Sequence, residues 1–224
     1  MSRTFKLGVL AAAVMATAPA VQAFEAGDFI LRAGVAHVAP DDSSDVITVN
    51  GAAALGANAR VGVDSNSQLG IRGTYMLTSE LGLGLLAATP FKHNIVGAGD
   101  LAAAGKIAET KHLPPTLTLQ YFPMASSSAF QPFVGVGVNY TTFFEEKTTG
   151  ALEGSKLDLD DSVGVAFEIG MDYMLSENFG LNAAIWWADI STDAQVTLPD
   201  GTKTDKFEVE IDPMVYMVGF TYKF

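Results

Sequence analysis

Four ionisable residues stand inside segments that are otherwise built from apolar and small residues: Arg32, Arg72, Glu168 and Asp172. In each segment large apolar residues recur at every second position, and the ionisable residue takes the other parity. In a β-strand this places the four side chains on the face opposite the apolar one. Charges of opposite sign on one enclosed face are expected to pair, because an unpaired buried charge is strongly disfavoured. The pattern therefore predicts internal ion pairs with a structural role.

Residues that could support catalysis or bind a metal are sparse. The chain has no cysteine, and G-x-S-x-G, G-x-G-x-x-G and P-loop motifs do not occur. The three histidines, His37, His93 and His112, could in principle meet around a metal ion, but they are widely separated in the sequence. We therefore predict no enzyme activity, no cofactor and no metal site.

The first 23 residues predict a secretory signal peptide. Arg3 and Lys6 precede an uncharged apolar run, and the segment ends in Val21-Gln22-Ala23, which fits an A-x-A-like cleavage site. The run is too short to span a bilayer as a helix, and no stop-transfer pattern follows it. We expect cleavage after Ala23, which leaves residues 24–224 as one domain in an exported protein.

The composition of the chain points to a membrane. The sequence is 49% hydrophobic with a mean hydropathy of +0.26, yet it offers no further stretch of about 20 uncharged apolar residues. Only helices and closed barrels pair every backbone group in hydrocarbon, so a barrel is the structure that remains. The formal net charge of −12 disfavours nucleic acid as a partner, since Lys and Arg supply most of that affinity.

Eight segments alternate with period two and predict strands: 29–36, 68–75, 81–88, 116–121, 134–141, 163–173, 179–187 and 216–224. An even number of strands is typical of outer-membrane barrels. Short connections alternate with long ones, the long ones being 39–67, 91–111, 145–160 and 191–207. The fold class predicted is an all-β, eight-stranded antiparallel transmembrane barrel with short periplasmic turns and long extracellular loops. A large soluble β-sandwich is the alternative.

The ends of the predicted barrel suggest partners. Most acids fall in the long connections, where they form a solvated rim or bridge to lipopolysaccharide through divalent cations. The chain ends on Phe224 after alternating outward aromatic and apolar residues, a pattern by which the barrel-assembly machinery recognises such proteins. Outer-membrane lipid and lipopolysaccharide are therefore expected around a protein of the Gram-negative cell outer membrane.

Several blocks carry a resemblance that covers nearly all of the predicted mature chain. They are Glu25-Ala26-Gly27-Asp28-Phe29, Gln68-Leu69-Gly70 with Thr74-Tyr75-Met76, Leu85-Leu86-Ala87-Ala88-Thr89-Pro90-Phe91-Lys92-His93, His112-Leu113-Pro114-Pro115-Thr116-Leu117, Asn139-Tyr140-Thr141-Thr142-Phe143-Phe144, Asp172-Tyr173, 186–190, Ile211-Asp212-Pro213 and Tyr222-Lys223-Phe224. Together these blocks resemble the OmpW family of outer-membrane proteins. The resemblance implies an eight-stranded barrel with a narrow, largely apolar channel for small hydrophobic molecules, which are released sideways through the barrel wall.

Leu86 and Trp186 face inward by parity and match the family pattern. The resemblance implies that they form an apolar constriction of the channel, whereas the plainer interpretation is that they fill the barrel core. His93 and His112 lie in matching blocks, which implies that they shape the channel mouth. Many inward positions are glycine, either leaving room for a channel or relieving crowding between strands.

Pro90, Pro114 and Pro115 flank the second long connection. A proline cannot donate a ladder hydrogen bond, so pairing between the third and fourth strands should fail near their outer ends. The resemblance implies a lateral exit at this point, and ordinary strand termination is the alternative.

The function expected is passive uptake of small hydrophobic molecules with lateral release. Two alternatives stay open: a narrow channel for small polar solutes such as amino acids, and a surface receptor or adhesin that acts through its loops.

Overall fold

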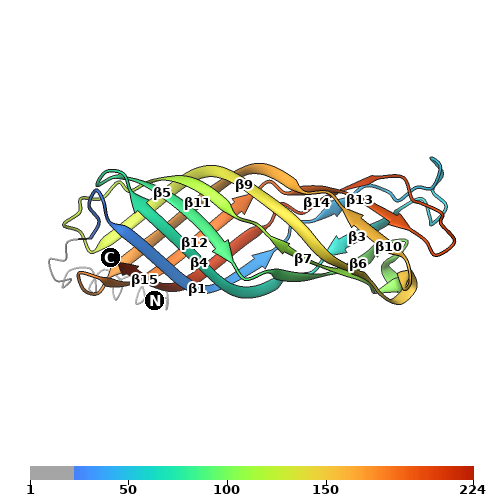
Figure 1. Cartoon of the computed structure of the whole chain (residues 1–224), viewed down its shortest axis with the longest axis horizontal. Coiled ribbons are helices and arrows are strands. Elements are labelled where there is room, and N and C mark those ends of the chain that lie inside the picture. The colour runs from blue at the N-terminus through green and yellow to red at the C-terminus, as the bar shows by residue number, and fades with distance from the viewer. Residues whose placement is uncertain (1–22) are drawn as a thin grey trace, which may run out of the picture.

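A computed structural model describes residues 23–224 of the chain. The predicted signal peptide, residues 1–23, therefore lies outside the described residues except for Ala23. The described part is an elongated, twisted barrel that continues at one end into further sheet (Figure 1).

Eight long antiparallel strands close the barrel within residues 23–224. They are β1 (Phe29–Ala39), β4 (Asn66–Met76), β5 (Leu81–Ala88), β8 (Thr116–Tyr121), β9 (Phe130–Thr148), β11 (Ser162–Met174), β12 (Phe179–Ala188) and β15 (Met214–Lys223). Each strand pairs with the next in this order, and β15 pairs back to β1, so the barrel has no free edge. The predicted strands are thereby confirmed.

The outward face of the barrel is apolar, as the period-two pattern predicts. Val163 is 71% exposed and Val218 is 65% exposed, although both are large apolar residues within regular strands. Similar side chains from all eight strands form a continuous belt that only hydrocarbon could cover favourably. Tyrosines such as Tyr75, Tyr121 and Tyr222 lie on this face near the short turns, where a girdle at the membrane interface belongs.

The short turns gather at one end of the barrel, at residues 77–80, 122–129 and 175–178. Phe224 and the first described residues lie at the same end (Figure 1). The Ala23 amide donates to the Ser126 carbonyl at 2.6 Å, and the Phe224 amide donates to the Phe29 carbonyl at 2.9 Å. Short turns mark the periplasmic end of such barrels.

The long connections fold largely into strands instead of irregular loop. On one side β3 (Ala59–Val63), β6 (Phe91–Gly99) and β7 (Lys106–Leu113) extend the sheet next to the outer half of β9. Opposite, β10 (Lys156–Leu159), β13 (Ser191–Thr197), β14 (Phe207–Glu210) and β2 (Ser43–Ser44) form a separate four-stranded sheet. We refer to these two as the outer sheets.

The apolar and polar faces of the strands change sides between the barrel and the outer sheets. In the outer sheets the apolar side chains face inward, where Ile47, Val61, Ile95, Ile107 and Phe207 belong to one buried cluster. Their neighbours in sequence, including Glu208 on β14, point out. This alternation is typical of a sheet with one face on an apolar core and the other face in water. The outer sheets therefore project beyond the bilayer.

The helical elements of the described chain are two short 3₁₀ turns, η1 (Ala102–Ala104) and η2 (Gly150–Leu152). No helix within residues 23–224 has the length and apolar character needed to cross a membrane.

Candidate functional site

The inward charges of the barrel pair across its interior. The Arg32 guanidinium donates to the Asp172 carboxylate from Nε, at 3.0 Å to Oδ1, and from Nη2, at 2.5 Å to Oδ2. Asn182 and Thr221 also donate to Asp172, and both members of the ion pair are fully buried. This satisfies the requirement that a buried ion pair be supported by further hydrogen bonds.

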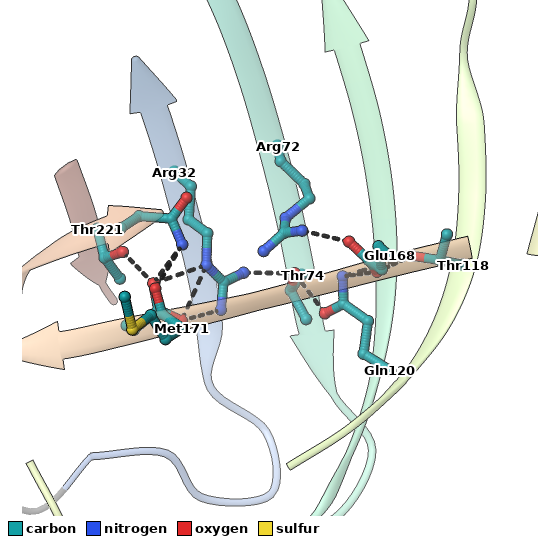
Figure 2. A network of polar contacts seen from close by, with 10 residues as sticks. Arg32, Arg72, Thr74, Thr118, Gln120, Glu168, Met171 and Thr221 are labelled. Atoms are coloured by element: carbon teal, nitrogen blue, oxygen red, sulfur yellow. Dashed lines mark hydrogen bonds and ion pairs between the residues drawn. The ribbon is translucent and has the colours of Figure 1, made fainter. Parts of the chain in front are cut away.

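A second buried pair lies beside the first, between Arg72 and Glu168 (Figure 2). Thr118 and Gln120 each donate to Glu168 Oε1 at 2.7 Å. Thr74 connects the two pairs, because it accepts from Arg32 Nη1 at 2.8 Å and donates to Gln120 at 3.0 Å. The four predicted residues are thus brought together in one network, which we call the charge plug.

The Arg72 guanidinium also lies against aromatic rings. Its Nε and Nη2 atoms are buried without hydrogen-bond partners, and its guanidinium carbon lies 4.5 Å from the Phe133 ring centre and 5.2 Å from that of Trp186. Cation–π attraction at desolvated sites is worth about 2 kcal/mol. The aromatic contacts therefore offset part of the cost of those unpaired donors.

The inward glycines make room for the plug. A Cβ atom at Gly135 would lie 2.5 Å from Glu168 Oε1, one at Gly84 would lie 2.3 Å from Gln120 Nε2, and one at Gly170 would lie 2.4 Å from the Phe133 ring. At these positions the space left by glycine is occupied by large side chains. Relief of crowding, one of the two interpretations left open by the sequence, explains them.

Below the plug, toward the short turns, apolar side chains complete the filling. Phe24, Phe122, Phe133, Met76 and Met174 are all at most 1% exposed. The periplasmic half of the barrel is therefore packed across its section, as expected for eight strands.

Above the plug lies a small cavity of about 40 Å³, which we call the lower cavity. Leu86 and Trp186, the two predicted constriction residues, both line it, and Trp186 is 3% exposed. The indole Nε1 of Trp186 is buried without a hydrogen-bond partner. The structure thus brings these two residues to one narrow, almost wholly apolar space directly above the plug.

The three prolines lie where strand pairing is interrupted. The β5–β8 ladder ends at the pair Leu86 and Thr116, and the β6–β7 ladder begins at the pair Phe91 and His112. Between them, residues 87–90 face residues 113–115 without a backbone hydrogen bond across. We call this interruption the wall gap.

Pairing continues on both flanks of the wall gap. Ala88 still pairs with Gly70 of β4, and the Tyr140 amide of β9 donates to the Pro115 carbonyl at 3.0 Å. The gap is thus confined to a single seam of the barrel. Ala88 and Pro114, one from each side of the seam, also line the lower cavity.

A larger cavity of about 290 Å³ lies between the outer sheets, and we call it the outer cavity. Its walls are mostly Val, Ile, Leu and Ala side chains from both sheets. It shares Val38, His112, Ile190 and Pro213 with the lower cavity, so the two lie end to end. About 10–15 Å³ of such volume holds one water, so the outer cavity has room for a small organic molecule.

The histidines divide between two locations. His37 is exposed on the outer surface, where its Nδ1 lies 2.9 Å from Ser67 Oγ. His93 and His112 line the outer cavity with ring centres 4.9 Å apart. Burial lowers the pKa of both, that of His112 to about 3 with a further contribution from His93, so both rings are neutral at pH 7. No group of three metal-binding side chains occurs within residues 23–224.

Some acids at the outer end of the molecule pair with lysines. Glu145 pairs with Lys111 at 2.7 Å, and Asp160 pairs with Lys206 at 2.5 Å. The predicted solvated rim is thus cross-linked by ion pairs at several points on the strands that carry it.

Sequence reasoning missed two parts of the site. Parity places the polar members of the plug on the inward face but does not show that they hydrogen-bond the charges; these residues are Thr74, Thr118, Gln120, Asn182 and Thr221. The outer cavity does not follow from the prediction of long extracellular loops, because it depends on those connections forming strands. The alternation of Phe207 and Val209 with Glu208 and Glu210 was the available signal.

A closed eight-stranded antiparallel barrel with an apolar outer belt and a plugged polar interior defines an integral outer-membrane β-barrel protein. Residues 25–224 match the model of the OmpW family, and the chain belongs to that family. It is therefore an outer-membrane protein of a Gram-negative bacterium.

Individual relatives agree with this assignment. The chain is 45% identical over 221 residues to outer membrane protein W of Vibrio cholerae, with 97% of each chain covered. The crystal structure of OprG from Pseudomonas aeruginosa gives a TM-score of 0.84 at 47% identity, covering 91% of this chain and 99% of OprG. The structure of AlkL in lipid bilayers gives a TM-score of 0.70 at 26% identity, covering 92% of this chain and 94% of AlkL; AlkL is a protein of Ectopseudomonas oleovorans.

Proposed function

We propose that this protein carries small hydrophobic molecules passively across the outer leaflet of the outer membrane. The molecule enters the outer cavity from outside, passes Leu86 and Trp186 in the lower cavity, and leaves sideways through the wall gap into the bilayer. The role is transport, without catalysis.

The observation that carries the proposal is the order of these parts along the barrel. An apolar cavity stands above a narrower apolar cavity, the narrower one ends on the charge plug, and the wall gap lies beside it. A molecule in the lower cavity has the packed plug below it and the unpaired seam with Ala88 and Pro114 at its side. Lateral movement is the route that breaks the fewest contacts.

The chemistry of the walls selects the cargo. An ion or strongly polar solute would lose its hydration among aliphatic side chains, at a cost of several kcal/mol. An apolar solute gains about 25 cal/mol for each Å² of surface removed from water, both in the cavity and again in the bilayer. The hydrocarbon of the membrane is therefore a sufficient sink, and no energy source is required.

Two partners support this role in the membrane. We propose that the acid–lysine network of the outer sheets contacts lipopolysaccharide, whose leaflet is the barrier that apolar molecules must pass. Phe224 is 66% exposed at the end of β15, and we propose that the barrel-assembly machinery recognises it. Neither contact takes part in selecting the cargo.

An uptake assay tests the proposal. Vesicles with a lipopolysaccharide outer leaflet would contain the protein or lack it, and the initial rates would be compared for N-phenyl-1-naphthylamine and radiolabelled glycine. We expect faster entry of the apolar probe alone. Faster entry of glycine alone would overturn the proposal and favour a channel for small polar solutes.

A further inference from the structure

The outer cavity has polar side chains in its walls, and most of them are already occupied. The Thr192 hydroxyl donates to the Asp160 carbonyl at 2.7 Å, and the Thr110 hydroxyl donates to the Lys111 carbonyl at 3.2 Å. Thr204 accepts from the Val196 amide at 2.9 Å. The hydrogen-bonding capacity left for a guest molecule therefore lies mainly with the two histidines.

His93 is fixed by the backbone. Its Nδ1 lies 2.5 Å from the Asp64 carbonyl oxygen, which can only accept, so Nδ1 carries the proton. Because the ring is neutral, Nε2 is then an acceptor, and this atom is buried without a partner. His93 is thereby held in one tautomer and one orientation next to His112.

His112 has no hydrogen-bond partner within the described residues. Its Nδ1 is buried and unpaired, and its ring lies against three neighbouring rings: Phe91 at 5.5 Å, His93 at 4.9 Å and Phe143 at 6.0 Å between centres. It is also among the few side chains that line both cavities. An unsatisfied, neutral imidazole thus stands at the passage from the outer cavity to the lower one.

We propose that His112 hydrogen-bonds the hydroxyl group of a passing molecule, so that the protein prefers uncharged apolar molecules with one hydroxyl, such as phenols and long-chain alcohols, over bare hydrocarbons. This inference rests on the proposed function and names the chemical class of its cargo.

The chemistry of a hydroxyl matches the site. A hydroxyl both donates and accepts, so it can pair with a neutral imidazole in either tautomer. The rest of such a molecule is apolar and suits walls that a charged group would find unfavourable. In this setting an unpaired buried nitrogen costs free energy, and a guest hydroxyl removes that cost.

The test compares naphthalene with 2-naphthol, which differ by one hydroxyl. Binding of each is measured by fluorescence titration to the full chain in lipid nanodiscs, with empty nanodiscs as the blank. The variant His112→Phe keeps a flat ring between Phe91 and Phe143 but has no nitrogen, and His37→Phe removes an exposed histidine as the matched control. A third variant, His112→Gln, restores a polar side chain.

We expect the ratio of 2-naphthol to naphthalene affinity to fall about tenfold in His112→Phe, to stay unchanged in His37→Phe and to recover in part in His112→Gln. An unchanged ratio in a folded His112→Phe barrel, with naphthalene still bound, overturns the hydroxyl preference and leaves the proposed function standing. If His112→Phe does not fold, a preference for 2-naphthol that is weaker in His112→Gln than in the parent supports the inference. A ratio in His112→Gln equal to that of the parent, or no preference for 2-naphthol in the parent, overturns it. Failure of both probes to bind the parent overturns the inference and the proposed function together.

Discussion

At the scale of single residues, the charge plug is the part of the interior whose disruption should cost most. Arg32 and Asp172 are fully buried, and each supports further partners in the same network. Removing one member leaves the other as an uncompensated charge away from water. The loss of stability should therefore be much larger than that from breaking an ion pair at the surface.

We predict that Arg32→Met lowers the free energy of unfolding by about 3–5 kcal/mol, because it leaves Asp172 buried and unpaired. Urea unfolding in detergent micelles, followed by tryptophan fluorescence, measures the change. Adding Asp172→Leu to this variant should restore much of the stability.

The control is Lys206→Met, which breaks the pair with Asp160, where both side chains are more than half exposed. Exposed pairs contribute about 0–1 kcal/mol, so this variant should unfold almost as the parent does. Equal effects of Arg32→Met and Lys206→Met would show that the plug is not a tightly coupled network.

His112 makes stability depend on pH. Burial lowers its pKa from 6.5 to about 3, while the unfolded chain keeps the ordinary value. The unfolded state therefore binds more protons between these two values, and stability falls as the pH falls from 6.5 toward 3. Burial lowers the pKa of His93 as well, although the neighbouring Asp64 opposes this shift, and His93 adds to the same trend.

We predict that lowering the pH from 6.5 to 5.5 removes about 1 kcal/mol of stability through His112. The slope should be smaller in His112→Phe and unchanged in His37→Phe when urea unfolding is measured at each pH. A slope equal in all three proteins would contradict the burial of a neutral His112.

At the scale of elements, β9 depends on glycine to pass beside the plug. Glu168 is held by Arg72, Thr118 and Gln120, so it cannot move aside for a Cβ atom at Gly135. Gly73 is the matched control. A Cβ there would meet only the tip of the Phe29 ring, at 3.0 Å on the lipid-facing side.

We predict that Gly135→Ala destabilises the barrel by about 1–3 kcal/mol, the range for overpacking a well-packed interior, whereas Gly73→Ala changes stability by less than about 1 kcal/mol. The midpoint of thermal unfolding on a gel that separates folded from unfolded barrel measures both. A larger effect of Gly73→Ala would refute the role assigned to Gly135.

The membrane-spanning strands could be predicted because their outward face carries one simple signal, as Val163, Phe167 and Ile169 illustrate on β11. The outer sheets were harder, because β14 places Phe207 and Val209 inward and its acids outward, the reverse of the barrel. The pairing partners in the plug could not be derived at all. Arg32 and Asp172 are 140 residues apart, and only the stagger of the closed barrel brings them to one level.

At the scale of the whole molecule, the structure divides into three levels with different tasks. The packed periplasmic end and the charge plug close the axial route, the lower cavity lies above the plug, and the outer sheets enclose the outer cavity in the aqueous surroundings. The proposed passage through the molecule therefore needs a side opening. Pairing stops at one seam, between barrel strands β5 and β8. The sequence predicts an interruption of pairing at its prolines, whereas the cavity behind them depends on how the long connections fold.

The most direct measurement is the uptake of N-phenyl-1-naphthylamine by the variant Pro114→Ala with Pro115→Ala, in vesicles with a lipopolysaccharide outer leaflet. Alanine at position 114 restores one backbone donor that faces the wall gap, whereas the donor at position 115 faces β9, as the Pro115 carbonyl does. One ladder bond worth about 1 kcal/mol would slow uptake about fivefold. Pro123→Ala, in the turn between β8 and β9, is the control and should leave the rate unchanged. Uptake by the double variant at the parent rate would contradict lateral release through the wall gap.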